Sequence, residues 1–356
     1  ACSSLENGAE AEITRTALEA TLETQFLAAL GEQESVSADF SARFFAATYL
    51  AHRDATKLEA WREKAEMWLL DWENEGLLAR DGDRISLSPR GKAWRATDLS
   101  PATCRRLLGA LETLPNLDFS GVGGLARLNA HLWRVLGAAP EAGSEIGRFF
   151  GPRSRFAATP ADLETLGASW LRGESMEAIF AALPRIARAG YAGLEAWVEG
   201  SQNEAEAEIS PDWSASYERW LDFGRAGLET WAPRLWSAAA TLAPLAGGAA
   251  RRVDWRGGAA LWSAGVDSPW AARAVSAGAP GTRRGAAAVG RLWPTRAAFS
   301  PADPLGLGRL QSETEREVVE RAFETALREV GGRHCVAGRN LLALRDWVWA
   351  KAGLSK

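Results

Sequence analysis

The chain has 356 residues, a hydrophobic content of 47% and a formal net charge of -4. This length allows two or three domains with buried cores, and the small net charge excludes a chain that binds polyanions over its whole surface. The charge is unevenly spread, because residues 1–100 hold 18 acids and 11 bases whereas residues 251–300 hold 8 Arg and 2 Asp. The sequence therefore predicts one basic face late in the chain.

The three cysteines are far apart in the sequence, and no Cys-x-x-Cys pair occurs. This pattern indicates neither a zinc site nor a disulfide framework, and it favours a reducing compartment. The sequence has no signal peptide and no run of about 18 apolar residues. We therefore expect a soluble cytoplasmic protein that does not contact a membrane. The chain begins at Ala1, which either removal of an initiator methionine or a fragment of a longer protein explains.

The first predicted helix covers residues 11–30, and Ser37 is expected to cap a second helix that carries Phe40, Phe44 and Phe45. From Leu58 to Glu75, apolar residues recur at helical spacing. We expect Trp68 on this helix to be buried against the segment that follows.

That segment is predicted to be a small hairpin. Residues 77–79 and 85–87 read as short strands, and Gly82 lies in the turn between them, as a tight hairpin requires. Residues 88–91 are expected to close the hairpin, and Ser100 with Pro101 to begin the next helix. A helix that leads into a hairpin is the core of a winged-helix module. Such a module binds nucleic acid or packs against protein.

From Leu99 onward the pattern is helical, with breaks at glycine and proline and no competing strand. A long helix over 212–245 should be kinked at Pro233, and the Gly- and Arg-rich segment 247–258 is expected to be mobile. Further helices are predicted at 258–264, 268–277, 283–292, 312–330 and 339–351. Ser312 and Glu315 fit a capping box at the start of the fourth of these.

The predicted fold class is mainly α, with a winged helix, a multi-helix bundle and a helix-hairpin-helix-like segment. The predicted domains are a connecting helix (1–34), a winged-helix domain (35–98), a ratchet-like helical bundle (99–246), a basic helix-hairpin-helix-like segment (247–300) and a C-terminal helical segment (301–356).

Sequence motifs for catalysis are missing. There is no P-loop, no His-Glu-x-x-His and no Gly-x-Ser-x-Gly. Residues 121–124 are glycine-rich, but no predicted strand precedes them, so the start of a helix is favoured over a dinucleotide loop. We predict no catalytic residue, no metal site and no cofactor in this chain.

Tryptophan is unusually frequent, with 17 residues. Trp231 and Trp236 flank Arg234 in one predicted helix, where aromatic rings beside a cation could stack on bases and hold phosphates, or simply pack in a core. The helix predicted from residue 283 follows a Gly-containing turn, and its free N–H groups with nearby arginines would suit a phosphate. An ordinary helical corner is the alternative. The candidate nucleic-acid-binding residues are Trp231, Arg234, Trp236, Arg252, Arg283, Arg284 and Arg291.

Four segments carry a resemblance to a known family. Residues 65–103 look like a winged helix with the first helix of a bundle, and residues 168–175 look like a helix break of the form Trp, then Gly-Glu-Ser. Residues 229–242 are similar to a ratchet helix, and residues 265–284 resemble a Gly-Val … Gly-x-Arg region. In this order the segments resemble the C-terminal half of the Ski-type DExH helicases of superfamily two, over roughly residues 10–295. Both motor domains are absent, and residues 301–356 match no part of that family that we can place.

This resemblance implies the accessory nucleic-acid-binding half of an ATP-dependent DNA or RNA helicase or translocase. That half would guide a single strand, whereas ATP and Mg²⁺ would bind the parent motor. The implied partners are single-stranded or partly unwound nucleic acid and RecA-like motor domains, in cis or in trans. The alternative is a self-standing winged-helix DNA-binding regulator or a protein-interaction adaptor. The acidity of the 58–75 helix disfavours deep insertion into the major groove, and the lack of site motifs disfavours an enzyme of another type.

Overall fold

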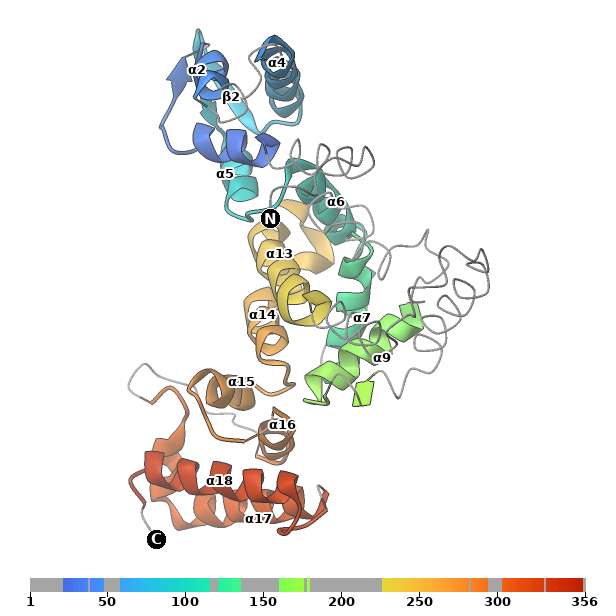
Figure 1. The fold of residues 1–356 in the computed structure, drawn as a ribbon, viewed down its shortest axis with the longest axis vertical. Helices are drawn as coiled ribbons and strands as arrows, with labels where there is room; N and C mark the ends of the chain where they lie inside the picture. The colour runs from blue at the N-terminus through green and yellow to red at the C-terminus, as the bar shows by residue number, and fades with distance from the viewer. Residues whose placement is uncertain are drawn as a thin grey trace, which may run out of the picture. The chain divides into compact units, whose positions relative to one another are not determined.

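The computed structural model describes residues 22–37, 39–47, 58–115, 121–135, 160–175, 178–179, 226–281, 283–293, 303–329 and 331–354. These residues are mainly helical with one small sheet, which confirms the predicted mainly α class (Figure 1). The chain divides into two compact units. Unit 1 comprises residues 1–115, 138–147 and 237–252, and unit 2 comprises residues 116–137, 148–236 and 253–356. The limits of these units differ from the predicted domain boundaries. The predicted boundaries remain predictions.

Unit 1 contains the sheet. In chain order its described elements are the helix of residues 22–30, β1 (Val36–Ser37), α2 (Phe40–Ala46), α4 (Leu58–Asn74), β2 (Leu78–Asp81), β3 (Arg84–Leu87), α5 (Pro89–Arg95) and α6 (Pro101–Glu112). The three strands are antiparallel in the order β1-β3-β2. Leu78 pairs with Leu87 and Val36 pairs with Ile85, so these four buried apolar side chains cover the core.

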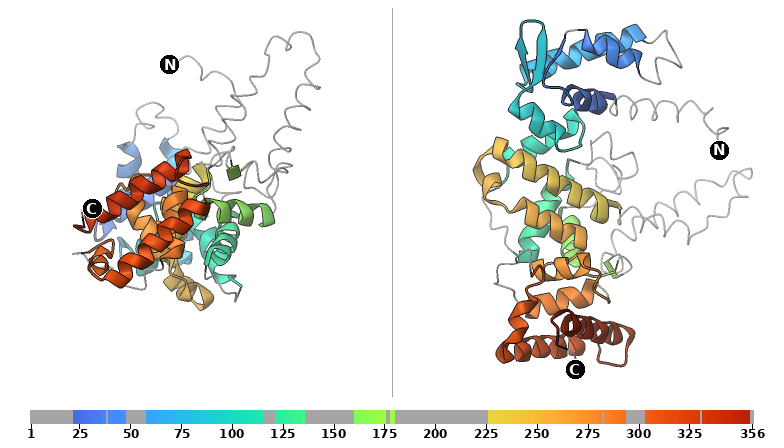
Figure 2. Two further views of the ribbon diagram at one scale, coloured as in Figure 1. Left: turned by 90° about the horizontal axis from the view of Figure 1, so that it is seen from below. Right: turned by 90° about the vertical axis from the view of Figure 1, so that its left-hand side faces the viewer.

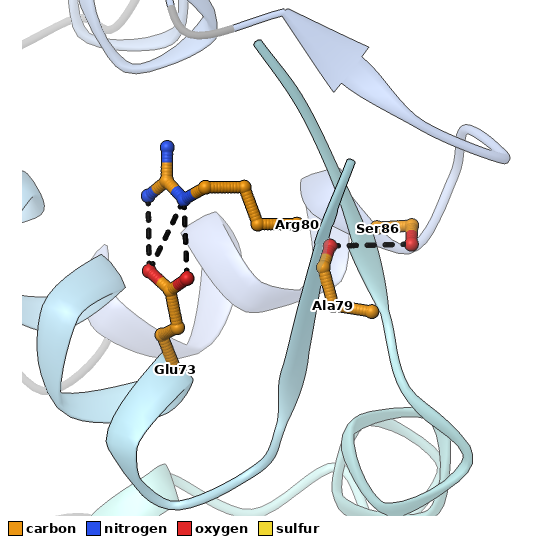
Figure 3. A network of polar contacts seen from close by, with 4 residues as sticks. All are labelled: Glu73, Ala79, Arg80 and Ser86. Atoms are coloured by element: carbon orange, nitrogen blue, oxygen red, sulfur yellow. Dashed lines mark hydrogen bonds and ion pairs between the residues drawn. The ribbon is translucent and has the colours of Figure 1, made fainter. Parts of the chain in front are cut away.

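The helix predicted from Leu58 and the hairpin that follows are both confirmed. Gly82 has a φ of 61° at the first of the two loop positions, where a type II′ turn requires glycine. An ion pair joins the end of α4 to β2: Arg80 Nε and Nη2 lie 3.1 and 3.0 Å from the two carboxylate oxygens of Glu73 (Figure 3). On the neighbouring strand, Ser86 Oγ donates to the carbonyl of Ala79 at 3.4 Å (Figure 3).

The segment after the hairpin differs from the prediction. Residues 88–91 begin helix α5 instead of only closing the hairpin, because Ser88 Oγ accepts a hydrogen bond from Gly91 N at 3.1 Å and Pro89 occupies the first turn. A Cβ on Gly91 would lie 2.2 Å from the carbonyl oxygen of Leu77, so only glycine allows this close approach. The same Ser-Pro signal at Ser100 correctly predicted the start of α6, where Ser100 Oγ accepts from Thr103 N.

Ser37 does not cap α2. It lies in β1, and Asp39 occupies the N-cap position. Ser37 Oγ donates to the Asp39 carboxylate instead. The predicted cap was therefore two residues early, because the short strand ends where the helix was expected to begin.

The core of unit 1 is aromatic, and it corrects the prediction for Trp68. Trp72 has no exposed surface, whereas Trp68 is half-buried. Both rings pack on the helical side of the unit: the centroid of Phe26 lies 5.8 Å from Trp72 and 6.2 Å from Trp68. The prediction that Trp68 is buried against the hairpin was wrong, because helical spacing defines a face but does not say which residue lies at its centre.

Unit 2 consists only of helices in its described part. They are α7 (Gly121–Trp133), α9 (Pro160–Leu171), η4 (Ala226–Trp231), the first residues of α13 (Ala232–Ala246), α14 (Trp255–Ala264), α15 (Pro269–Ser276), α16 (Arg283–Leu292), η6 (Leu307–Gln311), α17 (Glu313–Glu329) and α18 (Val336–Lys351). Helices α7 and α9 pack against each other, and α17 and α18 lie side by side (Figure 2). The rest of α13 and η5 (Gly248–Arg252) belong to unit 1.

Most late helices begin within three residues of their predicted starts, with several local differences. Residues 212–225 of the long helix predicted over 212–245 lie outside the described residues. From residue 226 the helix is described, and its first part is a π-helical turn that ends just before Pro233. The segment expected to be mobile is helical: η5 is followed by α14, which Asp254 caps at Gly257 N with a distance of 3.0 Å. Glu315 does not complete a capping box. It accepts from Arg309 and from Trp293 Nε1 instead.

Replacing Trp72 by alanine should lower the free energy of unfolding of unit 1 by about 3–5 kcal/mol, because a fully buried indole leaves a cavity. Trp68→Ala should cost less, since that ring is only half-buried. Denaturant unfolding of both variants measures the difference. Equal costs for the two variants would contradict this assignment of the core.

Candidate nucleic-acid interface

Trp231 and Arg234 pair with each other. Trp231 ends η4 and Arg234 lies in the first turn of α13, with its guanidinium carbon 4.9 Å from the centroid of the Trp231 ring. The Trp231 side chain is only 6% exposed. The indole therefore holds the cation in place, and it presents little surface to a ligand.

Trp236 lies in the core of unit 2. It is 0% exposed, and its Nε1 donates to Asn129 Oδ1 on α7 at 3.0 Å. The Trp255 and Trp262 rings of α14 lie 5.1 and 6.3 Å away. A ring without exposed surface offers no face on which a base could stack, so the structure gives Trp236 the packing role that was the alternative.

Arg283 also stacks on a tryptophan, although sequence reasoning did not foresee this pair. Its guanidinium carbon lies 3.7 Å from the centroid of Trp170, near the end of α9. Trp170 Nε1 donates to the carbonyl of Trp262 at 3.0 Å. Three helix ends thus meet here: the C-termini of α9 and α14 and the N-terminus of α16. We call this place the arginine junction, defined by Trp170, Gly173, Gly265, Arg283 and Arg284.

Two glycines make the junction possible. Gly265 ends α14 with a φ of 63°, and a Cβ there would lie 2.5 Å from Arg283 Nη1 and 2.9 Å from the Trp170 ring. Gly173 follows α9 with a φ of 76°, and a Cβ there would lie 2.6 Å from the backbone nitrogen of Arg284. Side chains at either position would separate the helix ends. The junction brings together residues of two segments that lie far apart in the sequence, 168–175 and 265–284.

The exposed cations at this end of unit 2 are Arg172, Arg284 and Arg291. Arg291 lies two turns into α16 and pairs with Asp267, with Nη1 and Oδ2 3.5 Å apart. Arg172 was not among the predicted residues. It directly precedes Gly173 in the Trp-Leu-Arg-Gly-Glu-Ser segment, and this position was the only available signal.

Asp267, the partner of Arg291, has a buried side chain that is 5% exposed. Its Oδ1 has no hydrogen-bond partner in the described structure. Burial raises the pKa of Asp267 above its ordinary value, and the positive charges of Arg291 and Arg172 oppose this shift. The carboxylate therefore holds Arg291 at a cost in desolvation.

Arg252, another of the predicted nucleic-acid-binding residues, belongs to unit 1. It ends η5 and is exposed, while its neighbour Arg251 donates to the carbonyl of Pro244 at 2.7 Å. Three of the seven predicted residues, Arg252, Arg284 and Arg291, are exposed. Arg234 and Arg283 stack on indole rings, and the two tryptophans are buried.

Comparisons of the chain with protein-family models, with curated proteins and with solved structures find no match. Over the described ranges, no set of three or more histidine, cysteine or acidic side chains is grouped as a metal site requires. None of the helices in those ranges has both the length and the apolar content that a bilayer crossing demands.

Gly258→Ala should destabilise unit 2, because the new Cβ would lie 2.1 Å from Cζ3 of the buried Trp236 ring. We expect a loss of about 1–3 kcal/mol in the free energy of unfolding, as for other overpacked cores. Gly123→Ala is the matched control, since no atom lies within 4 Å of its Cβ and the change should stabilise α7 by roughly 0.5–1 kcal/mol. A Gly258→Ala variant as stable as the control would contradict the packing of Trp236.

The raised pKa of Asp267 predicts a pH dependence of stability. The folded state binds the Asp267 proton more tightly than the unfolded state, so the cost of ionising this buried group appears as the pH rises above 3.8, the ordinary pKa of an aspartate side chain. The stability of the wild type relative to Asp267→Asn should therefore fall as the pH rises above about 4. Denaturant unfolding at several pH values tests this, with Asp81→Asn at an exposed position as control. A constant or opposite difference would refute it.

Proposed function

We propose that this chain is the accessory nucleic-acid-binding part of an ATP-dependent DNA or RNA helicase or translocase, which guides a single strand and carries no ATPase motor itself. The order of elements in residues 22–95 supports this proposal. A helix, β1, α2 and α4 precede a β2–β3 hairpin, and the sheet order is β1-β3-β2. This arrangement fits a winged-helix module with β2–β3 as its wing.

The observation that carries the proposal is the arginine junction. It joins the helix break at Gly173 to the start of α16, which are two of the four segments that resemble the helicase family. α15 and α16 are connected through Gly278 and Gly281, with φ values of 73° and 111°, and this connection fits a helix-hairpin-helix. Exposed arginines beside such a turn suit the phosphates of a strand.

The contact residues of the proposal follow from exposure. Arg284 and Arg291, with the added Arg172, would bind phosphates in unit 2, and Arg252 would do so in unit 1. Arg283 would act through its stack on Trp170, which fixes the start of α16. Trp231 and Trp236 would stabilise the packing of the helices as buried residues. The proposal does not include stacking of bases on these two rings.

Arg172→Ala combined with Arg284→Ala should weaken binding of a single strand to a similar degree for every sequence. Each lost phosphate contact lowers the slope of log affinity against log salt concentration by about 0.7 for single strands, so the double variant should lose about 1.4. Titration of a fluorescent oligonucleotide at several salt concentrations measures this slope.

The control for that titration is Arg321→Ala with Arg328→Ala, which removes the same charge from exposed positions on α17. We expect the control to keep the wild-type slope. If both double variants kept the wild-type slope and affinity, Arg172 and Arg284 would merely be solvated and the proposal would fail. A fall of equal size in both would indicate a diffuse effect of net charge and would also overturn it.

A further inference from the structure

Helix α4 has two faces of different character. Ala65, Leu69 and Trp72 are buried in the core of unit 1, whereas Met67 and Leu70 are 63% and 60% exposed. These two residues are three apart, so they lie next to each other on the helix surface. Within the described ranges, no other helix exposes two large hydrophobic side chains.

Carboxylates flank this apolar pair. Glu63, Glu66 and Asp71 are exposed, and each lies one, three or four residues from Met67 or Leu70. No hydrogen bond or ion pair engages their side chains in the described part of the chain. The two cations of α4 are engaged elsewhere: Arg62 Nη1 lies 3.2 Å from Glu59 and Lys64 lies 5.3 Å from the centroid of Trp61.

The charge of this face argues against a nucleic-acid ligand. In a winged-helix arrangement α4 would be the helix that enters the major groove, but its exposed carboxylates would face the phosphates with the wrong sign. An apolar centre with a charged rim is instead the pattern of a protein interface. Methionine suits such a centre, because its flexible side chain adapts to the groups packed on it.

We propose that the outer face of α4, defined by Glu63, Glu66, Met67, Leu70 and Asp71, docks a basic amphipathic helix of a protein partner. Apolar residues of that helix would cover Met67 and Leu70, and its lysines or arginines would pair with the three carboxylates. Charge complementarity selects this occupant over an acidic or neutral helix. The inference goes beyond the proposed function, because it does not require the arginine junction to bind a strand.

The test uses the full chain and a fluorescein-labelled synthetic peptide of about five turns, with leucine at one helical face and lysine elsewhere. A second peptide carries glutamate in place of each lysine. Fluorescence anisotropy measures both affinities. The wild-type chain should bind the basic peptide and not the acidic one.

Two sets of substitutions separate the apolar and the charged contributions. Met67→Ser with Leu70→Ser should weaken binding of the basic peptide by about tenfold or more, since central anchor residues dominate such interfaces. Glu63→Lys, Glu66→Lys and Asp71→Lys together should abolish binding of the basic peptide and create binding of the acidic one. All five positions are exposed, so the variants should keep the wild-type unfolding transition.

Matched controls lie on other helices. Val336→Ser removes an exposed apolar side chain from α18, and Glu313→Lys, Glu324→Lys and Glu329→Lys together reverse three exposed charges on α17. Both should bind the basic peptide like the wild type, and so should Arg172→Ala with Arg284→Ala, which tests the proposed function separately.

Several results would overturn the proposal. One is equal affinity of the basic peptide for the wild type and the Met67→Ser, Leu70→Ser variant. Another is a loss of oligonucleotide affinity in that variant, which would make α4 a nucleic-acid surface. A third is a concentration-dependent dimer in sedimentation that the same variant abolishes, which would show that a second copy of the chain covers this face.

Discussion

Both units depend on the burial of indole rings. A tryptophan side chain buries a large apolar area, and its Nε1–H can also form a directional hydrogen bond where an acceptor lies within reach. In unit 2 the carbonyl of Trp262 accepts from Trp170, and Asn129 accepts from Trp236. These hydrogen bonds connect α9 to α14 and α13 to α7. Unlike apolar contacts, they depend on the relative orientation of the two groups. The high tryptophan content is therefore explained first by packing.

The same rings order the basic side chains. An arginine on a helix surface normally samples many rotamers, whereas a guanidinium stacked on an indole loses that freedom before any ligand arrives. Arg283 on Trp170 and Arg234 on Trp231 are held in this way. For Arg283, this order depends on the close packing of the helix ends around Gly173 and Gly265, where a Cβ would clash. The next residue, Arg284, is exposed and is not stacked on a ring in the described part of the chain.

Acidic and basic side chains are concentrated in different parts of the chain, and the structure shows which groups surround each set. The acids of α4 surround two exposed apolar side chains, which is a pattern for a protein partner. In unit 2, Arg283 and Arg284 lie in the first turn of α16, where backbone N–H groups without a helical partner add to their positive charge. The proposed docking face and the proposed strand-binding arginines involve different residues, so the two hypotheses that the sequence left open are compatible.

Local signals in the sequence determined the helices and the hairpin. Helical spacing predicted α4 from Leu58, glycine at residue 82 predicted the turn, and Ser100 with Pro101 predicted the start of α6; each signal acts through a backbone preference that needs no distant partner. Tertiary structure alone decided which ring of α4 is buried, that Trp236 lies in a core, and that Trp170 meets Arg283. Periodicity defines a face of a helix but not the groups that this face contacts. Residues about a hundred positions apart, such as Trp170 and Arg283, come into contact only when the helix ends pack so closely that glycine is required at residues 173 and 265.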